Sequence, residues 1–232
     1  MRYFGGKQRI ANELIPIIDL LRGDRTYFEP FVGGANVITR VEGGRRVASD
    51  VVPELINMYK ALQTGWQPPG QLSREEYDQI KAMTEPHPLK AFAGFGCSFA
   101  GKYFGGYASS GERNYAANAA SSLKTKVKGM ADVEFYHGDY RSFDPTNCLI
   151  YCDPPYNGTT SYSAAGKFNS ESFWAICRWW ALDNTVLVSE YDAPSDWTVL
   201  WEKSVKTDIR GKDGKINRTE KLFLVPSPRG GC

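Results

Sequence analysis

The sequence has few of the residues that metal and disulfide sites need. Of its 232 residues only two are histidines, His87 and His137, so a mechanism that requires several histidines as ligands or bases is not expected. The five cysteines stand at positions 97, 148, 152, 177 and 232. This spacing fits neither a disulfide framework nor a zinc site. A Gly-x-x-x-x-Gly-Lys-Ser/Thr segment is also missing, which argues against a phosphate-binding P-loop.

Long apolar runs and a strong net charge are missing too. No run approaches the roughly 18–20 apolar residues of a membrane span, and the N-terminus lacks a signal-peptide pattern, so we expect a soluble cytoplasmic protein. A net charge of +2 does not by itself indicate a nucleic-acid partner. Basic residues do cluster at Lys124, Lys126 and Lys128 and over residues 203–221. Either cluster is as consistent with a solvated surface as with a binding site.

Apolar patterning predicts strands that alternate with helices. Strands are expected at residues 26–29, 45–49, 133–136, 148–152 and 185–189, with periodic apolar helices among them. Residues 199–209 and 218–225 flank an Asp-Gly pair and predict a hairpin. The sequence therefore predicts an α/β fold with a mostly parallel sheet and an antiparallel C-terminal hairpin.

The alternating pattern is interrupted at residues 66–70, where Trp-Gln-Pro-Pro-Gly marks a boundary. A capping box at residues 73–76 predicts a short helix to about residue 83. A stretch rich in glycine and aromatic residues follows, and then a helix is expected over residues 114–130. We therefore predict a small, mainly helical insertion at residues 66–130. It lies within one domain formed by residues 1–65 and 131–232.

The most informative segment is Asp153-Pro154-Pro155-Tyr156, which follows the apolar run at residues 148–152. Open α/β sheets bind ligands at the carboxyl ends of their strands. Proline lacks a backbone N–H, so the carbonyls of this turn have no role in a ladder and can face a ligand. A carboxylate, a carbonyl and an aromatic ring suit an exocyclic amino group on a flat base. The alternative interpretation is an ordinary turn at the end of a strand.

Three further strand ends carry glycine or acidic residues. The first expected strand ends at Glu29 and continues into a Gly33-Gly34 loop, where a ligand can approach the backbone closely. Asp50 ends the second strand, a position at which an acidic side chain can hold ribose hydroxyls. Asp139 follows the third. A single Gly-Gly loop is usually a plain turn, but together these residues predict a site for an adenosine-containing cofactor.

Four segments together resemble the Dam-type DNA adenine methyltransferases, which use S-adenosylmethionine. They are Tyr3-Phe4-Gly5-Gly6-Lys7, Glu29-Pro30-Phe31-Val32-Gly33-Gly34, Ala48-Ser49-Asp50 with Asn57, and Asp153-Pro154-Pro155-Tyr156. The resemblance implies a Rossmann-like methyltransferase fold. It also implies methyl transfer to the 6-amino group of an adenine flipped out of double-stranded DNA, with residues 66–130 as the target-recognition region. Neither a metal nor an obligate protein partner is implied.

The resemblance also implies roles for single residues. The catalytic residues would be Asp153, Pro154, Pro155 and Tyr156. The cofactor-binding residues would be Tyr3, Gly5, Gly6, Lys7, Glu29, Pro30, Phe31, Gly33, Gly34, Asp50, Asp139, Tyr140 and Asp153. The DNA-binding residues are expected to be Arg2, Lys102, Tyr103, Lys124 and Lys126.

Three alternatives stay open at this point. Asp-Pro-Pro-aromatic motifs also occur in enzymes that methylate RNA or a cytosine amino group. A catalytically silent DNA-binding relative is a further possibility, although such a protein has no need to keep Asp153 and Tyr156. The aromatic residues near Lys102 can belong to a packed glycine-rich loop instead of a DNA contact. A bacterial restriction-modification system or a phage would be a natural setting for the enzyme.

Overall fold

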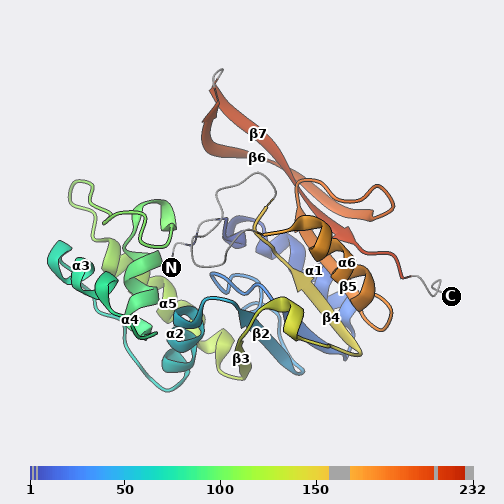
Figure 1. Ribbon diagram of the computed structural model, residues 1–232, viewed down its shortest axis with the longest axis horizontal. Helices are drawn as coiled ribbons and strands as arrows, with labels where there is room; N and C mark the ends of the chain where they lie inside the picture. Colours follow the sequence, from blue (N-terminus) through green and yellow to red (C-terminus); the bar gives the residue numbers. More distant parts are fainter. Residues whose placement is uncertain (2, 4, 157–167, 212–213, 228–232) are drawn as a thin grey trace.

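The computed structural model describes residues 1, 3, 5–156, 168–211 and 214–227, and side chains in these ranges except over 205–217 (Figure 1). Its centre is a seven-stranded sheet in the order β3-β2-β1-β4-β5-β7-β6. The strands are β1 (Thr26–Glu29), β2 (Arg46–Asp50), β3 (Val133–His137), β4 (Cys148–Cys152), β5 (Thr185–Glu190), β6 (Thr198–Gly211) and β7 (Gly214–Leu224). Strands β1 to β5 are parallel, and β7 runs antiparallel to both β5 and β6. The predicted mostly parallel sheet and antiparallel C-terminal hairpin are confirmed.

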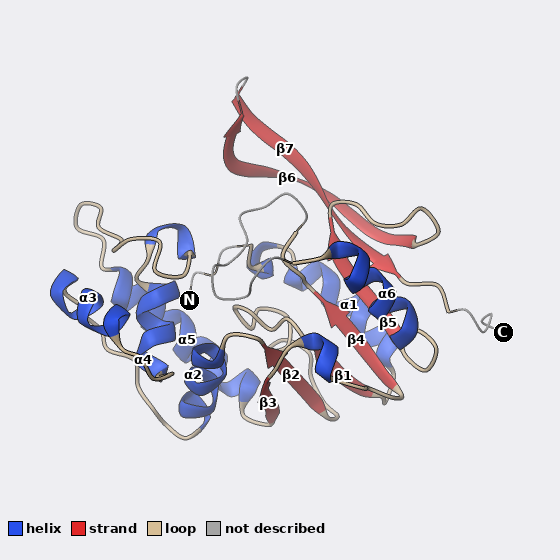
Figure 2. Ribbon diagram, viewed as in Figure 1, coloured by secondary structure: helices blue, strands red, loops and turns tan. Residues whose placement is uncertain are grey.

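Helices cover both faces of this sheet (Figure 2). The longer helices are α1 (Ala11–Arg22), α2 (Pro53–Gln63), α3 (Arg74–Ala82), α5 (Tyr115–Met130) and α6 (Ser170–Trp180); α4 (Pro88–Ala91) is a single turn. Alternate residues of one strand enter different cores: Tyr151 packs with α1 and α2, whereas Ile150 packs with α6. A sheet buried on both faces accounts for the continuous apolar run in β4. Among the described helices, none has the length and apolar character needed to span a membrane.

Chain order reverses at the middle of the sheet. From β1 the chain moves to β2 and then β3 on one side, whereas β4 and β5 lie on the other side. Neighbouring strands β1 and β4 are in register through pairs such as Phe28 with Ile150. Their carboxyl ends therefore meet at a topological switch point, which is where open α/β sheets bind ligands.

The insertion packs against α2, near the β3 edge of the sheet. Its predicted capping box is present, because the Ser73 hydroxyl accepts from the Glu76 amide at 3.1 Å and the Glu76 carboxylate accepts from the Ser73 amide at 2.7 Å. Asn114 caps α5 through its side chain alone, which accepts from the Ala117 amide at 2.8 Å. Figure 1 shows the β6–β7 hairpin projecting from the opposite edge of the sheet. The switch point thus lies between the insertion and the hairpin.

Candidate active site

The Asp153 carboxylate lies at the switch point, directly after β4, with 19% of its side chain exposed. The Lys7 ammonium is 2.7 Å from Asp153 Oδ1 and also donates to the Gly5 carbonyl at 3.2 Å. Lys7 is only 4% exposed, and its Nζ lies 4.3 Å from the centre of the Tyr156 ring. Two segments that lie far apart in the sequence are therefore in direct contact: Gly5-Gly6-Lys7 and Asp153-Pro154-Pro155-Tyr156.

Glu220 is a site residue that the sequence analysis did not assign. It comes from β7, and its Oε2 accepts a hydrogen bond from the Tyr156 hydroxyl at 2.7 Å. The same oxygen lies 3.8 Å from Lys7 Nζ. Lys7, Asp153, Tyr156 and Glu220 thus form one network, in which a single ammonium faces two carboxylates. The resemblance to the Dam-type enzymes also includes a weaker match at Arg218-Thr219-Glu220, but this match assigned no role to Glu220.

The network sets the charge state of Asp153. Burial raises the pKa of Asp153 to about 6, and Glu220 adds to this rise, whereas the Lys7 ammonium opposes it. Burial also acts to lower the pKa of Lys7, but the carboxylates of Asp153 and Glu220 outweigh it and raise that pKa. Asp153 is therefore a carboxyl group that ionises close to neutral pH, as is common for groups that act in catalysis.

The glycine loop after β1 is built against Tyr3. Gly33 has φ +43°, and a Cβ placed there would lie 2.8 Å from Tyr3 Cε1. A Cβ at Gly34 would lie 2.9 Å from Tyr3 Cβ. These contacts explain why both positions are glycine: the close approach of Tyr3 disfavours a side chain at either, and the left-handed backbone disfavours one at Gly33 as well. Tyr3 and the loop, which the family resemblance placed at the same cofactor, do lie together.

Asp50 holds the glycine loop in place. Its Oδ2 accepts from the Gly33 amide at 2.9 Å, and its Oδ1 accepts from the Val52 amide at 3.0 Å. Burial raises its pKa to about 6, although these backbone hydrogen bonds act to lower it. Each carboxylate oxygen has a further lone pair, so Asp50 can anchor the loop and still accept from a ligand hydroxyl.

Other predicted cofactor residues lie around the same strand ends. Glu29 is 2% exposed and accepts from the Tyr27 hydroxyl at 3.0 Å, and burial raises its pKa well above the usual range. Tyr140 packs on Phe31 with ring centres 5.0 Å apart. Asp139 forms a 2.7 Å ion pair with Arg141, which lowers its pKa. Pro30 directly follows β1, and the Gly5 carbonyl accepts from Lys7. The Gly6 amide donates to the Tyr3 carbonyl at 3.0 Å.

The predicted DNA contact at Lys126 is wrong. Its side chain is buried on α5, and its ammonium donates to the Gly34 carbonyl and, at 2.7 Å, to Asn36 Oδ1. Burial lowers its pKa to about 8. Lys126 therefore supports the glycine loop from behind and has no position from which to reach a phosphate.

The remaining predicted DNA contacts have mixed outcomes. Arg2 lies outside the described residues. Lys124 is exposed on α5, and Lys102 is partly exposed. Tyr103 is packed inside the insertion: its ring stacks near Phe95 with centres 4.8 Å apart, and its hydroxyl is buried. For Tyr103 the structure favours the packed-loop alternative over a base contact.

Part of the chain is similar in sequence to known proteins. Residues 3–85 match the family described as "D12 class N6 adenine-specific DNA methyltransferase". Over 199 residues the chain is 25% identical to "Modification methylase StsI" of Streptococcus sanguinis, covering 72% of this chain. The chain spans about 30% of the length of that relative.

Two solved structures have a partly similar course of the backbone. An RNA methyltransferase from Salinibacter ruber, solved with S-adenosyl-L-homocysteine, is 10% identical with a TM-score of 0.42 and covers 94% of this chain and 90% of its own. The rRNA methyltransferase AviRa from Streptomyces viridochromogenes is 16% identical with a TM-score of 0.42, covering 93% and 84%. At these values neither likeness bears on the function of this chain. The family prediction made from the sequence is nevertheless confirmed, because over residues 3–85 the chain is similar to the D12 class N6 adenine-specific DNA methyltransferases.

Proposed function

We propose that this protein is a site-specific DNA adenine methyltransferase. It transfers a methyl group from S-adenosylmethionine to the 6-amino group of an adenine flipped out of double-stranded DNA. The observation that carries the proposal is the contact of Lys7 with Asp153 and Tyr156 at the switch point of the sheet. The enzyme would act in the cytoplasm of a bacterial or virus-infected cell, where its substrate DNA lies.

The residues beside Asp153 fit the cofactor. The glycine loop is shaped by Tyr3 and by Asp50, and the Asp153 carboxylate can face a cation. When bound, S-adenosylmethionine supplies a methyl group activated by a positively charged sulfur. The residues that would hold it are Tyr3, Gly5, Gly6, Lys7, Glu29, Pro30, Phe31, Gly33, Gly34, Asp50, Asp139, Tyr140 and Asp153.

Asp153 and the Pro154 carbonyl would hold the amino group of adenine. That nitrogen is a poor nucleophile because its lone pair is delocalised into the ring. Two acceptors on its hydrogens localise the lone pair and orient it, so catalysis rests on positioning and electrostatics. Lys7 keeps Asp153 ionised and fixes its direction through the 2.7 Å contact. Pro155 stiffens the turn that presents both acceptors.

Tyr156 would stack on the flipped base. Its hydroxyl donates to Glu220, and its ring meets the ring of Tyr191 at an interplanar angle of 84° with centres 4.6 Å apart. Stacking of a base on an aromatic ring contributes about 1–3 kcal/mol. A ring fixed on two sides can accept the base without losing much rotamer freedom of its own.

We assign residues 1–65 and 131–232 to catalysis and residues 66–130 to target recognition. The insertion packs beside α2 at one edge of the sheet, so it lies next to a duplex whose adenine enters the switch point. Within it, Lys102 and Lys124 are the predicted phosphate contacts that remain.

One assay tests the proposal. The protein is incubated with labelled S-adenosylmethionine and duplex DNA, RNA or buffer, and the modified nucleoside is identified. We expect label in duplex DNA as N6-methyladenine. Label in cytosine, or in RNA alone, would contradict the proposal. Cofactor binding without transfer to diverse DNA would favour a silent DNA-binding relative.

A further inference from the structure

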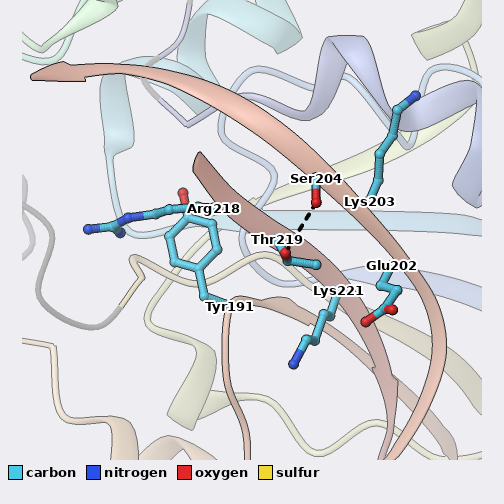
Figure 3. Close-up of a pocket in the computed structure, with 7 residues that line it drawn as sticks. All are labelled: Tyr191, Glu202, Lys203, Ser204, Arg218, Thr219 and Lys221. Atoms are coloured by element: carbon cyan, nitrogen blue, oxygen red, sulfur yellow. Dashed lines mark hydrogen bonds between the residues drawn. The ribbon is translucent and has the colours of Figure 1, made fainter. Parts of the chain in front are cut away.

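A cleft of about 780 Å³ opens beside the catalytic pocket, between the loop after β5 and the base of the β6–β7 hairpin (Figure 3). It is lined by Tyr191, Glu202, Lys203, Ser204, Arg218, Thr219 and Lys221. Neither the glycine loop nor the Asp153 turn lines it, so it is separate from the site described above.

Tyr191 connects this cleft to the catalytic pocket. The rings of Tyr191 and Tyr156 are in contact, with centres 4.6 Å apart. The Arg218 guanidinium lies 4.7 Å from the centre of the Tyr191 ring. Figure 3 shows Arg218 alongside the Tyr191 ring at the margin of the cleft. A nucleotide whose base stacks on Tyr156 would place its sugar and phosphates near Tyr191 and Arg218, because Tyr191 contacts Tyr156 and Arg218 lies over the Tyr191 ring.

The lining chemistry suits a phosphodiester. Three basic side chains and one carboxylate, Glu202, line the cleft, and the hydroxyls of Ser204 and Thr219 lie 3.5 Å apart. Lys203 pairs with Glu13, and Lys221 stands opposite Glu202 in the register of β6 with β7, so Arg218 is the cation that we assign to a ligand of the cleft. Arginine binds phosphate oxygens through its planar fork, and hydroxyl groups donate to the same oxygens.

We propose that this cleft binds the sugar–phosphate backbone of the target strand beside the flipped adenine, with Arg218 contacting a phosphate. The inference rests on the proposed function for the position of that adenine. The hairpin and the insertion lie at opposite edges of the sheet. The duplex is thus held from both sides of the catalytic pocket, and the hairpin, not only the insertion, contributes to DNA binding.

Arg218→Gln in the full chain tests the proposal. Arg178→Gln is the matched control, because Arg178 also lies over an aromatic ring, 5.8 Å from the centre of Trp197, but outside the cleft. Binding of a fluorescent mixed-sequence duplex is measured between 50 and 300 mM salt. We expect about ten-fold weaker binding for Arg218→Gln and a salt slope smaller by about one. The control should match the wild type in both quantities.

Two further measurements separate the outcomes. Binding of S-adenosyl-L-homocysteine should be equal in all variants, and Arg218→Lys should restore the salt slope because it keeps the charge. Equal DNA binding by Arg218→Gln and Arg178→Gln would overturn the proposed DNA contact in the cleft. It would not affect the proposed methyltransferase function, which is tested by methylation of DNA by the wild type. A reduced slope in a protein that never methylates DNA would support the cleft and overturn the proposed function. If Arg218→Gln does not fold, Lys221→Gln gives the same comparison. Wild-type protein that binds no DNA would overturn both.

Discussion

Lys7 and Glu220 should move the ionisation of Asp153 in opposite directions. Lys7 holds the carboxylate by an ion pair at 2.7 Å, and Glu220 repels it. A hydrogen bond to a charged group contributes about 1.5–3 kcal/mol, which corresponds to about 1–2 pKa units. Lys7→Met should therefore raise the pKa of Asp153 from about 6 by about one to two units. Glu220→Gln should lower it while keeping an acceptor for the Tyr156 hydroxyl.

Activity reports this shift because only the ionised carboxylate is a strong acceptor for the amino group. The rate of methyl transfer at saturating cofactor and DNA should fall as the pH drops through about 6 in the wild type. With Lys7→Met the fall should begin at a higher pH, so that the variant is impaired near pH 6.5 and recovers in alkali. With Glu220→Gln it should begin at a lower pH.

The opposite shifts of the pH–rate profile in Lys7→Met and Glu220→Gln identify Asp153 as the group that titrates. Asp50 also has a pKa of about 6, but its pKa is set by burial and by backbone amides, not by Lys7 or Glu220. Lys7→Arg keeps the positive charge and is the control for Lys7→Met. If both Lys7→Met and Glu220→Gln move the acid limb in the same direction, or leave it in place, Asp153 is not the ionising group.

Substitutions at three site residues, Asp153, Tyr156 and Gly33, test separate parts of the site. Asp153→Ala should abolish methyl transfer and weaken cofactor binding, as measured by label incorporation and calorimetry; an active variant would show that the site is misplaced. Tyr156→Phe keeps the ring and should reduce kcat by less than ten-fold, whereas Tyr156→Ala loses stacking of about 1–3 kcal/mol in base binding, measured with an extrahelical-base duplex. Gly33→Ala should lower the free energy of unfolding by about 1–3 kcal/mol, because it adds a Cβ 2.8 Å from Tyr3. A Cβ at Gly43 meets no atom within 4 Å, so Gly43→Ala should lower the free energy of unfolding by less in the same urea titration.

Stability should also depend on pH through Lys126. Burial lowers its pKa from 10.5 to about 8 in the folded protein. Between these values the unfolded chain keeps a proton that the folded chain has released, so the free energy of unfolding rises as the pH increases from about 8 to 10.5. Lys126→Met should remove this rise in urea titrations. Its salt slope for DNA should match the wild type, and a smaller slope would contradict the buried position.

Local patterns were sufficient to predict most of the fold. The strand that ends in Cys152 is a short apolar run, the strands that end in Glu29 and Asp50 each carry two adjacent apolar residues, and the capping box at Ser73 is a purely local signal. Parallel strand ends must meet at one edge of a sheet, so the glycine loop and Asp153 were expected to lie together. These predictions depend on short-range patterning and on topology.

Glu220 and Tyr191 could not be predicted in the same way. Their proximity to Tyr156 depends on β7 lying antiparallel beside β5, and on the register that pairs Glu190 with Lys221. No spacing in the sequence contains this information. Their role emerges only from tertiary packing.

Lys126 is different, because the sequence does contain its signal. The buried positions of α5 are Ala116, Ala119, Leu123, Lys126 and Met130. This alternation of three and four residues defines the apolar face of a helix. A lysine on that face needs internal acceptors, which Gly34 and Asn36 supply. Reading Lys126 with its charged neighbours, and not with its helical face, produced the wrong prediction.

The most direct test of the central claim is the identity of the methylated base in whole genomic DNA. The protein and its Asp153→Ala variant are expressed in bacteria that lack adenine methylation of their own, and the DNA is digested to nucleosides and analysed by mass spectrometry. A genome offers many sequences, so the unknown recognition sequence is no obstacle. We predict N6-methyldeoxyadenosine with the wild type and none with the variant. N4-methyldeoxycytidine, or the same yield of methyladenine from both proteins, would contradict the account.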